Sequence, residues 1–209
     1  MAEYAQHCGI DIFASFAQER MIDVSRELGF PAIKISSGNL TNYPLLQAVA
    51  QSGLPILLST GMSYLEEVKD AVQYLERHGA TQIAILQCTS LYPLPSHLVN
   101  LRVMPTLAAT FSQYPVGFSD HSEGIACAIA AAALGAHIIE KHVTLDRTFP
   151  GPEHHFSITM HDLATLVQSV KEVEAALGDA TKTPVTQEME LRGQYRRTLV
   201  AAVDIHAGD

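Results

Sequence analysis

At 209 residues, with 47% hydrophobic and 17% charged side chains, the sequence has the composition of a globular protein and not of a disordered chain. Its formal net charge of -9 argues against nucleic acid or an anionic membrane surface as a general partner, although a local basic pocket for a small phosphate stays open. The three scattered cysteines have no CxxC spacing, so they predict neither a disulfide framework nor a zinc knuckle.

We expect a cytoplasmic protein. The cysteines fit a reducing compartment, and the first residues have no apolar run typical of a signal peptide. The most apolar stretch, residues 124–139, is too short and too rich in Ala and Gly to span a bilayer.

Short β-rich runs alternate with longer helical patterns along the chain. The predicted strands are at residues 10–14, 32–36, 55–59, 82–87, 116–119 and 137–141. Each is followed by a helix or by a loop and a helix, which is typical of a parallel sheet with crossover helices. Thr159 and Asp162 have capping-box spacing, which predicts the start of the last long helix.

This alternation fits an open doubly wound sheet or a TIM barrel. No GxGxxG stretch follows any strand, which disfavours a dinucleotide-binding sheet. Polar side chains instead follow nearly every strand, as in a barrel whose site forms at its C-terminal face. Six of eight units are visible, so the sequence predicts an incomplete TIM (β/α)8-type barrel over residues 1–178.

The pattern changes after the last long helix. Residues 179–195 are polar and are predicted to be a linker. Residues 196–209 are predicted to form a single strand that begins another domain.

Two histidines stand at the ends of the fifth and sixth predicted strands. Side chains alternate along a strand, so His121 shares a face with Ser119 and His142 shares a face with Glu140. Neighbouring strands lie about 4.8 Å apart, close enough for both imidazoles to bind one ion. Two ligands leave positions open for a substrate oxygen, and Mn, Mg, Co or Zn would fit. Two ordinary surface histidines are the alternative.

Lys34 lies between two isoleucines and should point into the barrel. Three roles compete for it: a Schiff-base lysine, a cation for a phosphate, or a member of a structural ion pair. Hydroxyls at adjacent strand ends, from Ser37, Ser59 and Ser119, favour the phosphate role.

Five ordered motifs run along the chain: KISSGNLTNYPLL, ILLSTGM, LQCTSLYPLP, GFSDHSEGI and IIEKHVTLDRTFPGPEHHFSI. In this order and spacing they resemble the sialic acid (N-acetylneuraminate) synthase family. The resemblance covers essentially the whole chain from about Asp11. The tail at 196–209 resembles the start of the family's antifreeze-like (SAF) domain, which implies truncation at the N-terminus and within that domain.

The resemblance implies a TIM barrel that condenses phosphoenolpyruvate with an N-acetylated hexosamine of the N-acetylmannosamine type. The product is a nine-carbon 2-keto sugar acid, and phosphate is released. It also implies a divalent metal, Mn2+ before Mg2+ or Co2+, and a homodimer when the protein is complete. The truncated chain alone is expected to be inactive.

Site roles carry over by motif. The metal ligands are His121 and His142, and the catalytic residues are Glu140 and Lys34. The phosphoenolpyruvate-binding residues are Lys34, Ser37, Ser59, Ser119, Ser90 and Ser15. The sugar-binding residues are Tyr92, Glu140 and Glu153.

Three positions depart from the family pattern. Asn39 stands where an acidic residue is usual, Ser90 where Asn is frequent, and Glu153 where the motif reads Gly-Pro-Asp-His. The acceptor sugar therefore stays open between N-acetylmannosamine and the precursors of legionaminic, pseudaminic or spore-coat polysaccharide acids. A non-catalytic remnant that binds a metal or a sugar phosphate is the alternative of a different class.

Overall fold

The computed structural model describes residues 1–208. The chain divides into two units, Met1–Ala176 and the part from Leu177 onward, and each is described by itself. Within the described residues, no helix combines the length and apolar character needed to cross a bilayer.

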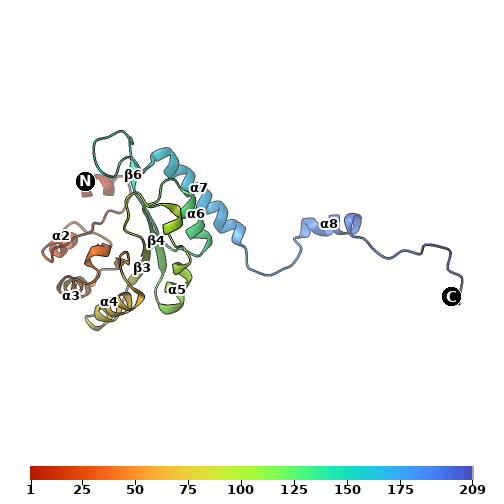
Figure 1. The fold of residues 1–209 in the computed structure, drawn as a ribbon, viewed down its shortest axis with the longest axis horizontal. Coiled ribbons are helices and arrows are strands. Elements are labelled where there is room, and N and C mark those ends of the chain that lie inside the picture. Colours follow the sequence, from red (N-terminus) through yellow and green to blue (C-terminus); the bar gives the residue numbers. More distant parts are fainter. Residues whose placement is uncertain (209) are drawn as a thin grey trace. The chain divides into compact units, whose positions relative to one another are not determined.

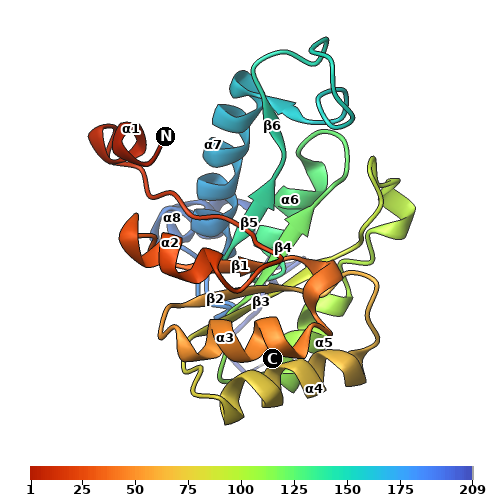
Figure 2. The same ribbon diagram turned by 90° about the vertical axis from the view of Figure 1, so that its left-hand side faces the viewer.

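The first unit is built on a curled sheet of parallel strands (Figure 2). The strands are β1 (Ile33–Ile35), β2 (Ile56–Ser59), β3 (Ile83–Cys88), β4 (Val116–Asp120) and β5 (Ile139–Lys141). They lie side by side in chain order, and every neighbouring pair is parallel. Consecutive parallel strands joined by helices are the construction of a barrel, so the predicted incomplete TIM-type barrel is confirmed.

Helices precede, connect and follow the strands (Figure 1). They are α1 (Ala2–His7), α2 (Met21–Glu27), α3 (Tyr43–Gln51), α4 (Leu65–Arg77), α5 (Val103–Thr110), α6 (Ala126–Ala133) and α7 (Met160–Leu177), with short 3-10 turns η1 (Ser37–Asn39) and η2 (Ser96–Leu98). The capping box is confirmed, because Thr159 N–H donates to Asp162 Oδ2 (2.9 Å) and Asp162 N–H donates to Thr159 Oγ1 (3.2 Å).

The core lies between the sheet and the helices. Ile35, Leu58 and Ile85 follow one another across the register of β1, β2 and β3 and are fully buried. Side chains at the intervening positions, such as Lys34, therefore point to the opposite, concave face. This alternation separates an apolar layer under the helices from a polar layer inside the curl.

The predicted strand at residues 10–14 does not form. Lys34 N–H donates to Ala14 O (3.2 Å), and Ser15 makes a single parallel bridge to Lys34. Because β1 has only three residues, it offers this neighbour few ladder positions, and Ile10 and Phe13 stay exposed. The sheet of the described chain has five strands, one fewer than predicted.

A second, two-stranded parallel pair was not predicted. It consists of β6 (Val143–Thr144) and β7 (Ile158–Thr159). The pair closes the long loop between them and places the start of α7 beside the end of β5.

The second unit differs from the prediction in two ways. The predicted linker at 179–195 contains a helix, α8 (Thr186–Tyr195), whose start is fixed by Val185 N–H donating to Glu188 Oε2 (3.1 Å). The predicted strand at 196–209 is absent from residues 196–208, and Asp209 lies outside the described residues. A strand needs a partner to satisfy its backbone groups, and no described segment pairs with this one.

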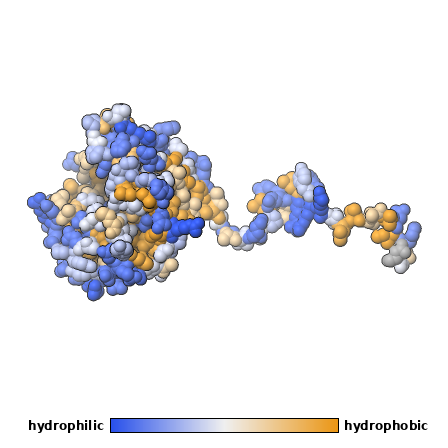
Figure 3. Space-filling model, in the orientation of Figure 1, coloured by the Kyte–Doolittle hydropathy of each residue, from blue (hydrophilic) through white to orange (hydrophobic). Residues whose placement is uncertain are grey.

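The same segment nevertheless carries apolar side chains. Leu199, Val200, Val203 and Ile205 are exposed, and Figure 3 shows apolar surface along this part of the chain. The assignment of the segment to an antifreeze-like domain stays a prediction.

Candidate functional site

A cavity of about 400 Å³ opens at the C-terminal ends of the parallel strands. Ten of the eleven residues to which the sequence assigned a role line this cavity, and Glu153 is the exception. The ten are Ser15, Lys34, Ser37, Ser59, Ser90, Tyr92, Ser119, His121, Glu140 and His142. Strand ends that are far apart in the sequence are therefore brought together at one point, as barrel geometry requires.

Lys34 and Glu140 form an ion pair inside this cavity. Lys34 Nζ lies 3.3 Å from Glu140 Oε1 and 3.1 Å from Oε2, and the lysine side chain is only 8% exposed. Ser119 Oγ donates to Glu140 Oε1 at 2.9 Å. The ion-pair role considered for Lys34 is therefore present in the structure, and the phosphate role remains compatible with it because the ammonium also lines the cavity.

His121 is held by its Nδ1 atom. That nitrogen lies 2.9 Å from Thr89 O and 4.0 Å from Cys88 Sγ. Burial by itself lowers the pKa of His121, but the contacts with Cys88 and Thr89 outweigh it, so the pKa lies above its ordinary value. Because Nδ1 is engaged, Nε2 is the ring nitrogen left for a ligand.

His142 is held in the same manner by Glu153. His142 Nδ1 lies 3.2 Å from Glu153 Oε2, and burial followed by the charge of His121 keeps the pKa of His142 below its ordinary value. Glu153 was assigned to the sugar, whereas here its carboxylate contacts His142 and Glu153 itself does not line the cavity. Its contact resembles the carboxylate that orients a metal-binding imidazole in many proteins.

The two imidazoles fit a metal site with open positions. Their ring centroids are 5.2 Å apart at an interplanar angle of 70°, and each ring uses Nδ1 for a protein contact. Within residues 1–208, no group of three or more His, Cys, Asp or Glu side chains is arranged to hold a metal. A metal bound by these two imidazoles would therefore take most of its ligands from substrate or water.

Tyr92 covers the histidine pair. Its ring centroid lies 4.0 Å from that of His121 and 5.7 Å from that of His142. Burial, followed by the nearby Cys88 and carboxylates, raises the pKa of Tyr92, so the phenol stays a neutral hydrogen-bond donor.

The sequence predicted the serines of this cavity at the strand ends, but it did not predict how closely their hydroxyls approach Gly61 and Cys88. Ser37 Oγ accepts from Gly61 N–H (2.9 Å) and lies 3.5 Å from Cys88 Sγ. A Cβ added at Gly61 would lie 2.3 Å from Ser90 Oγ and 2.8 Å from Ser37 Oγ, so only glycine leaves room for both hydroxyls.

Sequence reasoning missed Cys88 and Gly61 as parts of the site. Cys88 lies opposite Ser119 in the register of β3 and β4, so its place at a strand end was the signal that could have found it. Gly61 had no such signal, because its role depends on three side chains from other segments.

A larger cavity of about 570 Å³ lies between α4, α5 and the end of β3. It is lined by neutral side chains, including Gln87, Asn100 and Thr106, and contains no charged group. We place the site in the smaller cavity, because Lys34, Glu140 and the two histidines meet there.

The NeuB family model matches residues 1–182. The chain belongs to the NeuB family.

Relatives of known name agree with this NeuB assignment. The chain is 39% identical to the N-acetylneuraminate-9-phosphate synthase of Mus musculus, over 100% of the chain and 58% of that protein. It is 38% identical to the N,N'-diacetyllegionaminic acid synthase of Legionella pneumophila, over 100% of the chain and 59% of that protein. The chain thus spans about three-fifths of the length of these relatives.

A solved NeuB-type structure has the same fold. It is the N-acetylneuraminic acid (sialic acid) synthetase of Leptospira borgpetersenii in complex with citrate, with a TM-score of 0.84 and 34% identity. The match covers 94% of this chain and 69% of that one.

Proposed function

We propose that this chain carries the central part of a sugar acid synthase that condenses phosphoenolpyruvate with an N-acetylated hexosamine and releases phosphate. The observation that supports this most is one cavity in which Lys34 and a serine cluster lie beside the imidazoles of His121 and His142. One end of the cavity suits a phosphorylated anion, and the other suits a sugar whose carbonyl must be activated.

The anion end is formed by Lys34 and the hydroxyls of Ser37, Ser59, Ser90 and Ser119, with Ser15 at its edge. Among residues 1–208, Ser59 Oγ is the buried side-chain polar atom without a hydrogen-bond partner. A buried hydroxyl without a partner is costly, and a bound phosphate or carboxylate oxygen would satisfy it.

The metal end is formed by His121 and His142. A divalent cation, Mn2+ before Mg2+ or Co2+, would be held by their Nε2 atoms, and when bound it would polarise the carbonyl of the open-chain sugar. Glu153 and Thr89 O fix the ring orientations through the two Nδ1 atoms.

Glu140 stands between these two ends. It lies on β5, two residues before His142, and its carboxylate contacts Lys34 of β1 and Ser119 of β4, which hold it in place. In the proposed reaction the enol carbon of phosphoenolpyruvate attacks the sugar carbonyl carbon, water adds at the neighbouring carbon, and phosphate leaves. We assign proton transfer in this sequence to Glu140, and contacts with the sugar to Glu140 and Tyr92.

The acceptor sugar is not fixed by the residues of this cavity. Relatives include synthases named for N-acetylneuraminate 9-phosphate, legionaminic acid and pseudaminic acid. The different-class alternative is a metal- or sugar-phosphate-binding remnant without turnover, and a turnover assay separates it from the synthase.

The assay uses this chain joined to the segments of the Legionella pneumophila relative that it does not match. Phosphate release from phosphoenolpyruvate should require both an N-acetylated hexosamine and Mn2+. Borohydride with pyruvate should leave Lys34 unmodified. A borohydride-trapped adduct at Lys34 would establish the Schiff-base mechanism instead, and phosphate release without sugar would contradict the condensation.

A further inference from the structure

A buried charged cluster lies on the opposite face of the sheet from the cavity. It consists of Asp120, Lys141 and Ser122, named here the Asp120 cluster. Lys141 Nζ contacts Asp120 Oδ2 at 2.8 Å, and the two side chains are 4% and 0% exposed. Nothing in the proposed reaction uses these groups.

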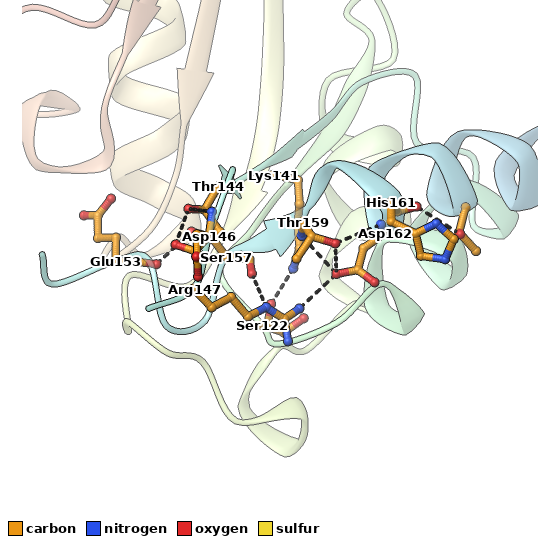
Figure 4. Close-up of polar contacts among 11 residues, drawn as sticks. Ser122, Lys141, Thr144, Asp146, Arg147, Glu153, Ser157, Thr159, His161 and Asp162 are labelled. Atoms are coloured by element: carbon orange, nitrogen blue, oxygen red, sulfur yellow. Dashed lines mark hydrogen bonds and ion pairs between the residues drawn. The ribbon is translucent and has the colours of Figure 1, made fainter. Parts of the chain in front are cut away.

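Ser122 completes the cluster. Its N–H and its Oγ both donate to Asp120 Oδ1, at 2.8 and 2.6 Å. Lys141 Nζ also donates to Ser122 O, and Figure 4 shows Lys141 directed at Ser122. Both carboxylate oxygens of Asp120 therefore have partners inside the protein.

The position of the cluster in the sequence connects it to the histidines. Asp120 and Ser122 flank His121, and Lys141 directly precedes His142. Asp120 and Lys141 are Cα partners in the last pair of the β4–β5 ladder. Lys141, the residue before His142, thus contacts the residues on both sides of His121.

Stability alone does not explain this arrangement. A buried ion pair loses so much hydration that apolar residues of similar volume often stabilise a protein equally well or better. An apolar pair would not supply these directional hydrogen bonds. The Asp120 carboxylate accepts from Ser122 N–H and so closes a turn about His121. Lys141 donates to the same carboxylate and fixes that turn against β5.

We propose that the Asp120 cluster positions His121 relative to His142 and thereby sets the geometry of the two-histidine metal site. This inference rests on the proposed function, because it assumes that the two imidazoles bind one metal. Its members act through the backbone of the ligands and do not touch the metal, so they are positioning residues.

The inference is tested in the 209-residue chain with Asp120→Asn and Lys141→Met combined. Both charges are removed together, so no single buried charge is left, and the new Asn side chain can still accept from Ser122. The variant should keep the wild-type circular dichroism and cooperative unfolding. Its Mn2+ affinity by calorimetry should fall about tenfold or more, the loss typical of changes around metal ligands.

A spectroscopic signature separates positioning from a general structural role. The visible absorption of bound Co2+ should shift in the variant, because it reports the coordination geometry. The matched control is Glu66→Gln with Lys69→Met, an exposed ion pair at 2.9 Å on α4, which should leave both affinity and spectrum unchanged.

Three results would overturn the inference. A folded double variant with wild-type Mn2+ affinity and Co2+ spectrum refutes the positioning role alone. Wild-type protein that binds no Mn2+ refutes the proposed metal site and this inference with it. If the double variant does not fold, Ser122→Ala decides: a smaller loss of Mn2+ affinity supports the role, and unchanged affinity refutes it.

Discussion

Lys34 contacts Glu140 and also lines the anion end of the cavity. Replacing it by Ala should weaken phosphoenolpyruvate binding by about 1.5–3 kcal/mol, or about 10- to 150-fold in Kd, because a charge-assisted contact to the anion is lost. Calorimetric titration with phosphoenolpyruvate measures this. Lys69→Ala, a lysine in an exposed ion pair, is the control, and equal affinity in both variants would contradict the assignment.

Gly61 is required by space and not by backbone conformation. The Cβ of Gly61→Ala would lie 2.3 Å from Ser90 Oγ, so we expect the serine cluster to move and phosphoenolpyruvate binding to weaken. Gly38→Ala is the matched control, because Gly38 also lines the cavity and has open space around it. The same calorimetric titration tests both, and an affinity loss in Gly38→Ala alone would argue against this explanation.

At this scale the sequence predicted residue types at strand ends well, because side-chain alternation fixes which residues share a face. It could not predict which side chain each of these residues contacts. Glu153 was assigned to the sugar and lies on His142 Nδ1, because the loop between β6 and β7 folds back over β5. Figure 4 shows the contacts of this loop, in which Arg147 reaches Ser157 and Asp162.

Strand β4 packs closely against its neighbours at Gly117. A Cβ at Gly117 would lie 2.6 Å from both Ile138 O and Leu86 Cδ2. Gly117→Ala should destabilise the protein by about 1–3 kcal/mol, as overpacking does. Urea unfolding measures the change, and Gly193→Ala in α8, where the added methyl group meets nothing, should not lower stability.

The start of α7 should give a pH dependence to stability. Hydrogen bonds from the Thr159 backbone and side chain hold the pKa of Asp162 below its ordinary value of 3.8. This stabilisation is present above pH 3.8 and is lost as pH falls through the lower folded pKa. Urea midpoints measured between pH 7 and pH 2 should fall less steeply in Asp162→Asn than in wild type. The exposed Asp70→Asn should behave as wild type, and parallel profiles for all three proteins would contradict the prediction.

Strands and helices were predicted correctly where local periodicity and spacing determine them. Strands were predicted wrongly where pairing with a neighbouring strand determines whether they form. The five strands of the sheet and the Thr159 capping box follow from local periodicity and spacing. Residues 10–14 and 196–208 have strand-like sequences but lack a continuous partner, so the structure leaves them without a ladder. The helix α8 was missed because its polar sequence was taken for a linker.

At the scale of the whole molecule, the central proposal is that His121 and His142, which follow the neighbouring strands β4 and β5, bind one metal. Calorimetric titration with Mn2+ of wild-type protein and of the combined His121→Ala and His142→Ala variant tests this point most directly. His97→Ala combined with His161→Ala, two exposed histidines outside the cavity lining, is the matched control. We expect Mn2+ binding in wild type and control and its loss in the His121 and His142 variant, whereas equal affinity in all three proteins would contradict the account.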